Sequence, residues 1–305
     1  MDNPTTHRIG IIGGSGLQHL LALKHIERVS IDTPFGHPSD AVLLGDLAGV
    51  PVAFLQRHGP GHRIPPSLIN VRANIAALRH LGCTQLLSLS AVGSLQPHCP
   101  PGSFVLVDQF IDRTFLREKT FFGHGLVGHV PFADPVCSRM RHDLVTACHS
   151  LRLPTVDGGT YVVMEGPQFS TRAESNLYRQ WGGTVIGMTA MPEAKLAREA
   201  EMCYGLVAMP TDFDCWHTEH EAVTAGLVSQ RMTRIAEQAN QLVEMVCQRL
   251  IHHRHDCPAG CQHALDTAIM THPHEQDPAI LARLGFVVPR LLKQLAHTPE
   301  GEFIT

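Results

Sequence analysis

The stretch IGIIGGSGLQHL (residues 9–20) places an apolar run directly before a glycine-rich turn. The short, branched apolar run predicts a buried β-strand over residues 8–12. Further runs of this kind predict strands at 41–46, 51–56, 85–91, 103–108, 155–164, 184–187 and 203–209. Apolar residues at spacings of three and four predict helices at 67–81, 135–151, 171–181, 191–201 and 222–251. Strands that alternate with helices indicate an α/β fold around a substantially parallel sheet.

The glycine turn GGSG itself favours an anion as its ligand. The Gly-x-Gly-x-x-Gly spacing of dinucleotide-binding loops is absent, and no Gly-Lys-Ser/Thr follows, as a triphosphate loop requires. Bare backbone amides and the hydroxyl of Ser15 remain, and they suit a small anion. A tight turn without a ligand is an equally open interpretation of this segment alone.

The bulk composition excludes several classes of protein. The chain has 305 residues, 44% of them apolar, with a net charge of −4 and a pI of about 6.6. No basic field attracts nucleic acid or a membrane surface, and no apolar run approaches the ~20 residues that span a bilayer. Nine scattered cysteines suit reduced thiols. A cytoplasmic protein is therefore expected, with one domain over residues 1–251 and a helical tail, 252–305, packed on it.

Two further segments offer groups that bind anions. Arg57 and His58 follow an expected strand, in a loop rich in glycine and proline, where α/β proteins place ligands. The guanidinium fork of arginine suits phosphate. Ser90 and Ala91 end another expected strand, where small residues allow a ligand to approach the backbone. A surface Arg–His pair and close packing of small residues are the alternatives.

The motif TDFDCW places Asp212 and Asp214 two residues apart after an apolar strand. In extended geometry both side chains point to one side, and their proximity raises the pKa of one carboxyl. A protonated carboxyl donates to a purine N7 nitrogen, and an ionised one accepts from an exocyclic amine. This pairing suits a 6-amino purine. A carboxylate pair that only caps a turn is the alternative.

Several long motifs, in order, resemble the purine nucleoside phosphorylase family over residues 8 to about 250. They are GIIGGSGL, DTPFGHPSDA, RHGPGHRIPPSLINVRANI, SAVGSL, DQFIDRT, EGPQFSTRAES, VIGMTAMPEAKLAREAE and TDFDCWHTEHEAV. The resemblance implies a single α/β domain with a mixed, partly barrel-like sheet flanked by helices. It is strongest to the branch that cleaves 5'-methylthioadenosine with inorganic phosphate, giving adenine and 5-methylthioribose 1-phosphate. It also implies a homotrimer or a hexamer, without metal or organic cofactor, and with active sites at subunit contacts.

The same resemblance assigns roles to individual residues. Asp212 faces the purine N7, and Asp214 helps to read the 6-amino side. The phosphate site consists of Ser15, Arg57, His58, Ser90, Ala91 and Thr189. The nucleoside contacts are Phe169, Ser170, Met188, His129, Val228 and Val287, with His129 supplied by a neighbouring subunit. Ordinary core packing is the alternative for Phe169, Met188, Val228 and Val287, and an exposed histidine is the alternative for His129.

The sequence departs from this branch at a few positions. Gly187 stands where relatives often carry Asn. The motif that it begins, GMTAMPEAKLARE, is more similar to that of relatives that act on methylthioinosine. Ser229 occupies a usually apolar position, and Gln168 replaces a common Arg. The Asp-x-Asp pair favours a 6-amino purine, so a 6-oxopurine or adenosine activity is the second hypothesis.

The tail contains a cluster of metal-binding residue types: His252, His253, His255, Cys257, Cys261 and His263. Cysteine and histidine at such spacings are able to bind zinc. A Cys257–Cys261 disulfide is a second option, since some thermophilic relatives pair cysteines near the C-terminus, and a solvated, histidine-rich helix end is a third. A metal-binding module with a vestigial enzyme site is the hypothesis from a different class. The expected site residues are all present, which argues against a vestigial enzyme site, and we expect no bound metal.

Overall fold

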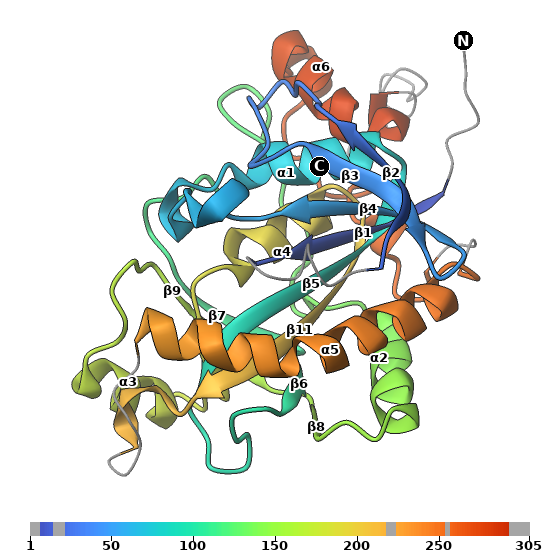
Figure 1. Ribbon diagram of the computed structural model, residues 1–305. Coiled ribbons are helices and arrows are strands. Elements are labelled where there is room, and N and C mark those ends of the chain that lie inside the picture. The colour runs from blue at the N-terminus through green and yellow to red at the C-terminus, as the bar shows by residue number, and fades with distance from the viewer. Residues whose placement is uncertain (1–6, 15–21, 218–223, 254–256, 293–305) are drawn as a thin grey trace.

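The structure is a computed structural model that describes residues 7–14, 22–217, 224–253 and 257–292 (Figure 1). Its strands are β1 (Arg8–Gly13), β2 (Lys24–Val29), β3 (Val42–Leu47), β4 (Val50–Gln56), β5 (Cys83–Ser94), β6 (Phe104–Leu106), β7 (Gln109–Arg113), β8 (Thr155–Asp157), β9 (Thr160–Met164), β10 (Val185–Gly187) and β11 (Cys203–Asp212). Its α-helices are α1 (Val71–His80), α2 (Ser138–Ser150), α3 (Arg172–Gln180), α4 (Ala190–Glu199), α5 (Ala225–Leu250) and α6 (Pro278–Val287).

The sheet is mixed and branches at its long central strand. The main order is β2-β3-β4-β1-β5-β10-β9-β7, while β11 pairs with β5 and continues through β6 to β8. Strand β5 pairs in parallel with β1 and β11 and antiparallel with β10. The branch gives the sheet the partly barrel-like shape that the family resemblance implies. The α/β class is confirmed.

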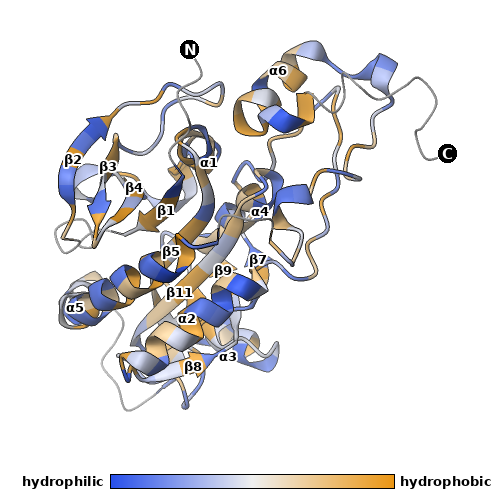
Figure 2. Ribbon diagram, turned by 90° about the vertical axis from the view of Figure 1, so that its right-hand side faces the viewer, coloured by the Kyte–Doolittle hydropathy of each residue, from blue (hydrophilic) through white to orange (hydrophobic). Residues whose placement is uncertain are grey.

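Helices cover both faces of the sheet because its central strands are apolar on both sides. Ile9 and Ile11 of β1 lie in one buried cluster and Ile12 lies in another, as alternation along a strand requires. Figure 2 shows α4 and α6 on one side of β5 and β11, and α2 and α5 on the other. Every residue of β11 is buried. Among the described helices, none has the length and apolarity that crossing a membrane would need.

Several expected elements have different boundaries. The strand expected at 155–164 is split into β8 and β9, because Gly158 and Gly159 turn the chain with positive φ angles. The helix expected from residue 67 begins only at Val71, where the Asn70 side chain accepts a hydrogen bond from the Ala73 amide. In its described residues, 252–253 and 257–292, the expected helical tail contains the α-helix α6 besides short turns. Strands β2 and β7 lacked the apolar run that predicts a strand; β2 is largely exposed.

Helix α3 begins as its sequence predicts. The Thr171 side chain accepts from the Glu174 amide, and the Glu174 carboxylate accepts from the Thr171 amide. This capping box satisfies two backbone donors that the helix cannot satisfy itself. It also fixes the direction in which the chain leaves the loop that carries Phe169 and Ser170.

Candidate active site

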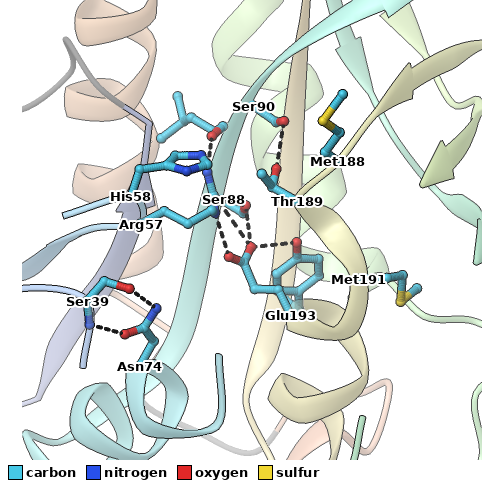
Figure 3. A network of polar contacts seen from close by, with 12 residues as sticks. Ser39, Arg57, His58, Asn74, Ser88, Ser90, Met188, Thr189, Met191 and Glu193 are labelled. Atoms are coloured by element: carbon cyan, nitrogen blue, oxygen red, sulfur yellow. Dashed lines mark hydrogen bonds and ion pairs between the residues drawn. The ribbon is translucent and has the colours of Figure 1, made fainter. Parts of the chain in front are cut away.

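Polar side chains from four separate segments converge around the carboxyl half of β5 (Figure 3). Arg57 and His58 follow β4, Ser90 lies in β5, and Thr189 follows β10 as the first residue before α4. Because β1, β4 and β5 are parallel neighbours, the turn after β1 and the loop after β4 emerge at the same edge of the sheet. Ser15, which the sequence analysis assigned to the phosphate site, lies outside the described residues.

The guanidinium of Arg57 is buried and mostly committed to groups of the protein itself. Its Nε donates to Glu193 Oε2 at 3.0 Å, Nη1 to the Leu89 carbonyl at 3.2 Å, and Nη2 to Ser88 Oγ at 2.9 Å. A longer bond of 3.4 Å joins Nη2 to Glu193 Oε1. Arginine has five N–H donors, so among the described residues one remains for an anion. Arg57 therefore acts largely by positioning, and its charge is offset by Glu193.

His58 is held as a neutral ring. Its Nδ1 lies 2.9 Å from the Ile64 carbonyl oxygen, which only accepts, so Nδ1 carries the hydrogen. Burial lowers the pKa of His58 to about 4. At neutral pH the Nε2 nitrogen is then an acceptor, and it suits the P–OH group of hydrogen phosphate. Its ring stacks on His62 at 4.0 Å between centroids.

Three hydroxyl groups meet opposite the Arg57–His58 segment. Ser90 Oγ lies 3.1 Å from Thr189 Oγ1 and 3.1 Å from the Tyr161 hydroxyl. The Tyr161 hydroxyl occupies the space where a side chain on Gly187 would begin. Gly187, which departs from the Asn of many relatives, is therefore required for Tyr161 to reach Ser90. Ala91 is partly buried beside this group, paired with Met209 of β11.

Asp212 and Asp214 lie together at the carboxyl end of β11, and both are nearly buried. Asp212 Oδ1 accepts from the Asp214 amide at 2.8 Å, and Oδ2 accepts from Thr211 Oγ1 at 2.8 Å. Within the described part of the chain, Asp214 Oδ2 is buried and makes no hydrogen bond of standard geometry, although the Ser175 and Ser170 side chains lie near this carboxyl and oppose the rise of its pKa. Desolvation by burial raises the pKa of both carboxyls. The pair thus combines a carboxyl inclined to hold a proton with an open acceptor, as a 6-amino purine needs.

Gly93 of β5 permits this arrangement. A Cβ atom built on it would lie 3.0 Å from Asp212 Oδ1 and 3.3 Å from Asp214 Cβ. Ser90, which carries one of the three clustered hydroxyls, precedes Gly93 by three residues on β5. The Cα atoms of these two residues are therefore about 10 Å apart. The anion-binding groups and the carboxyl pair are therefore the two ends of one region along β5.

Four expected nucleoside contacts lie near this region. Ser170 accepts from Cys215 through its carbonyl oxygen at 3.3 Å, which joins its loop to the Asp214 turn. Phe169, the preceding residue, is 45% exposed, so its ring is accessible for stacking on a base. Met188 packs against Gly166, where a Cβ would overlap its sulfur. Val228 is half-buried in α5, three residues before Arg231, which donates to the Thr211 carbonyl.

Two expected contacts lie elsewhere within this chain. Val287 is fully buried in the large apolar cluster near α6, and His129 is exposed, with its amide donating to the Ala268 carbonyl. Figures 1 and 2 place α6 far from α3, which lies beside the Asp214 turn. One chain alone does not bring these two residues to the carboxyl pair.

The sequence did not point to the residues whose hydrogen bonds hold the site side chains in position. Glu193 accepts from Arg57, Ser88 and Tyr204, and Arg117 joins the Glu165 carboxylate to the Met188 carbonyl. Each of these acts through contacts with residues more than ten positions away. The only signal for Glu193 was its place in the first turn of a helix, and that indicated a favourable interaction with the helix dipole.

Among the described residues, the tail histidines His253 and His263 pair with aspartates and not with the cysteines. His253 Nε2 lies 2.6 Å from Asp143 Oδ2, and His263 Nδ1 lies 3.1 Å from Asp266 Oδ2. His255 lies outside the described residues. Cys257 and Cys261 instead meet Cys137 and Cys203 in a buried group.

The comparisons with known proteins agree with the geometry. The model of the phosphorylase superfamily matches residues 8–248. An S-methyl-5'-thioadenosine phosphorylase of Bradyrhizobium diazoefficiens is 50% identical over 93% of this chain and 98% of its own length. The enzyme of that name from Thermosynechococcus vestitus is 52% identical over 90% of this chain and 95% of its own.

Solved structures give the same result. A methylthioadenosine phosphorylase from an antarctic soil metagenomic library is 44% identical, with a TM-score of 0.85 over 93% of this chain and 99% of its own. Methylthioadenosine phosphorylase from Schistosoma mansoni, solved with adenine, is 34% identical, with a TM-score of 0.78 over 93% and 98% of the two chains. The chain therefore belongs to the phosphorylase superfamily, and within it to the S-methyl-5'-thioadenosine phosphorylases.

Proposed function

We propose that this protein cleaves 5'-methylthioadenosine with inorganic phosphate, releasing adenine and 5-methylthioribose 1-phosphate in purine and methionine salvage. The observation that carries the proposal is the buried pair of carboxyls, Asp212 and Asp214, at the carboxyl end of β11, the strand that pairs with β5 and its Ser90 hydroxyl. This arrangement suits a nucleoside with its base at the carboxyl pair and its C1' carbon toward a bound phosphate. The high identity to phosphorylases of this name supports the same assignment.

The residues account for the movement of charge in such a reaction. A phosphate oxygen bonds to C1' while the C1'–N9 bond breaks, and the sugar carries positive charge in between. The anion held by Ser90, Thr189 and His58 offsets that charge. Asp212, whose pKa is raised by burial, hydrogen-bonds or protonates the purine N7 as the base departs. The proton that hydrogen phosphate gives up balances the one that adenine gains.

The open oxygen of Asp214 favours a 6-amino base. An exocyclic amine donates to a carboxylate oxygen, whereas the oxygen of a 6-oxopurine faces it as a second acceptor and is repelled. Phe169 offers an exposed ring close to this position, and Val228 offers apolar surface from α5.

We further propose that the enzyme is a cytoplasmic homotrimer, with a hexamer as the alternative assembly, and that it uses no organic cofactor. The position of His129 and Val287 away from the carboxyl pair supports an active site shared between subunits. Leu68, Phe115 and Leu116 are more than 70% exposed and give the chain an apolar surface suited to such a contact. Nine cysteines without a disulfide suit a reducing compartment.

A substrate panel with and without phosphate tests the proposal. We expect adenine and a sugar 1-phosphate from 5'-methylthioadenosine only when phosphate is present. Methylthioinosine and inosine should react more slowly by at least about tenfold, because they present an acceptor to Asp214. Adenine release without phosphate, or a preference for the 6-oxo nucleosides, would show that the assignment is wrong.

A further inference from the structure

Four cysteines that are far apart in the sequence form one buried group at the amino end of β11. The Sγ atoms of Cys137, Cys203, Cys257 and Cys261 all lie within 4.8 Å of one another. Each of the four side chains is at most 4% exposed. Cys203 begins β11, Cys137 immediately precedes α2, and the other two belong to the CPAGC turn after α5. We propose that these four thiolates bind one structural zinc ion.

The distances fit tetrahedral coordination. Zinc binds a cysteine thiolate at about 2.3 Å, and four such ligands at tetrahedral angles lie about 3.8 Å apart. Mutual separations within 4.8 Å therefore need only small side-chain adjustments. The Sγ atoms of Cys137 and Cys257 lie 3.4 Å apart, well beyond a covalent S–S bond. The ligands come from the ends of elements packed together, so the fold brings them into place.

The backbone around the cysteines is arranged for this geometry. The Gly260 amide donates to the Cys257 carbonyl at 2.8 Å, and Gly260 adopts a positive φ of 68°, so the turn brings Cys261 back beside Cys257. The Cys257 amide donates to Gln262 Oε1 at 2.8 Å. The Cys137 amide donates to the Tyr204 carbonyl at 2.9 Å, next to Cys203. The three-residue spacing between Cys257 and Cys261 is within the range of zinc-binding cysteine pairs.

Two polar groups donate toward the sulfur of Cys203. Arg139 Nη2 lies 3.6 Å from it, and Gln262 Nε2 lies 3.9 Å from it. Donors beside a metal-bound thiolate stabilise its charge, and an arginine offsets part of the net charge that four thiolates leave on zinc. A disulfide sulfur has no charge for these donors to stabilise. They favour thiolates over a pair of disulfides.

The site is structural because it is closed and distant from the carboxyl pair. With four thiolate ligands, no position is left for a substrate or a reactive water. Cys203 and Asp212 are the first and last residues of β11, about 30 Å apart in an extended strand. Zinc at the Cys203 end ties the tail after α5 to the start of α2 and to the sheet. The proposal replaces the sequence-based expectation of no metal, and it moves the ligands from the tail histidines to Cys137 and Cys203.

Binding involves no oxidation. Each of the four thiols gives up its proton to solvent as its sulfur bonds to zinc, so the reaction requires only the ion and a base. Two disulfides would require the loss of four electrons to an oxidant. Counting metal and thiols in the same sample therefore separates the two outcomes.

The test uses the full-length protein, produced with zinc and kept free of chelators and thiols. We expect about one zinc ion per chain by elemental analysis. After unfolding in chelator without reductant, all nine cysteines should react with a thiol reagent. Cobalt(II) in place of zinc should give the intense visible bands of tetrahedral thiolate coordination. Two disulfides would leave only five reactive cysteines, and that result would overturn the proposal.

Matched variants locate the metal. Cys257→Ala/Cys261→Ala should lose zinc, whereas Cys247→Ala, which removes a buried cysteine outside the group, should keep about one ion per chain. In case the double variant does not fold, zinc is removed from the wild type by a competing chelator. We expect its midpoint of thermal unfolding to fall by roughly 5–10 °C and to recover when zinc is returned. Nine reactive thiols without zinc uptake, or zinc retained by the double variant, would exclude this site.

Discussion

The two ends of β11 differ in the surroundings of their buried ionisable side chains. At the amino end, Cys203 meets three other cysteines in a space closed by α2 and the tail. At the carboxyl end, Asp212 and Asp214 are almost as buried, yet an oxygen of Asp214 has no hydrogen-bond partner among the described residues. A buried polar atom without a partner is costly, so this oxygen is a candidate acceptor for a donor group of a ligand.

The difference shows that burial alone does not identify an active site. Both ends collect ionisable side chains, and both lie on a fully buried strand. The amino end offers four identical soft ligands in a closed group, which suits a metal ion that stays in place. The carboxyl end offers unlike groups beside an exposed ring, Phe169, which suits a substrate that enters and leaves.

The largest effect is expected from Asp212→Asn at the carboxyl end. An amide is unable to give up a proton to the departing purine, so kcat with 5'-methylthioadenosine should fall about 10²–10⁴-fold. The loss should be smaller with methylthioinosine, which shifts preference toward 6-oxo substrates. In the wild type, activity should decline as pH rises through the raised pKa of Asp212, and this decline should disappear in the variant. Initial rates against pH measure both effects.

Glu237→Gln, which changes an exposed carboxylate on α5, is the matched control and should keep wild-type kinetics. The comparison of the two ends would also fail if Cys257→Ala/Cys261→Ala, folded and stable at the assay temperature, reduced kcat as strongly as Asp212→Asn. In that case the amino end would contribute directly to the chemistry.

A smaller effect is expected from Glu199, a buried carboxyl at the end of α4 that tests whether a raised pKa marks the active site. It accepts from Thr120 Oγ1 and the Phe121 amide, but burial raises its pKa to about 7. Between about pH 4.5 and 7 the unfolded state loses this proton while the folded state keeps it. The free energy of unfolding should therefore fall as pH rises, by about 3 kcal/mol from this group.

Urea unfolding from pH 4.5 to 8 measures this slope. Glu199→Gln should flatten it and leave the dependence of kcat on pH unchanged, since the residue lies apart from the carboxyl pair. Glu237→Gln again provides the control. A change in the pH profile of kcat for Glu199→Gln would show that Glu199 is coupled to the carboxyl pair.

The smallest effect is expected from Tyr161→Phe, which removes the tyrosine hydroxyl from the cluster that it forms with Ser90 and Thr189. The variant loses one hydrogen bond to Ser90, worth about 1 kcal/mol, so the KM for phosphate should rise about fivefold with little change in kcat. Gly187→Ala should act in the same direction, because its side chain would displace the Tyr161 hydroxyl. Tyr178→Phe is the control. An unchanged phosphate KM in both variants would remove Tyr161 from the anion site.

Much of the fold was predictable from local sequence. The α/β class and the cap of α3 follow from apolar periodicity and from Thr171 and Glu174, whose interactions span only a few residues. The prediction of a continuous strand over 155–164 was wrong, because two glycines turn the chain inside an apolar segment. In the described part of the tail, the helical segment is α6, and apolar spacing does not show which of the other short segments are turns.

The candidate site was predictable only in part. Arg57, His58, Ser90 and the two aspartates were found because each lies at or near the end of an apolar run. Their roles as site residues stay predictions. Tyr161 gave no such signal, since it lies within a strand and its hydroxyl reaches Ser90 only because Gly187 has no side chain.

By itself, the sequence determined most of the strands and helices and which loops carry polar residues, because these depend on neighbours a few positions apart. Tertiary structure decided how those groups combine. It committed most of Arg57 to Glu193, left Asp214 Oδ2 open, and joined Cys137 and Cys203 to the CPAGC turn. Hydrogen bonding and metal coordination act over a few ångströms, and only the packed chain brings to that distance residues as far apart in sequence as Arg57 and Glu193, which are separated by 136 positions.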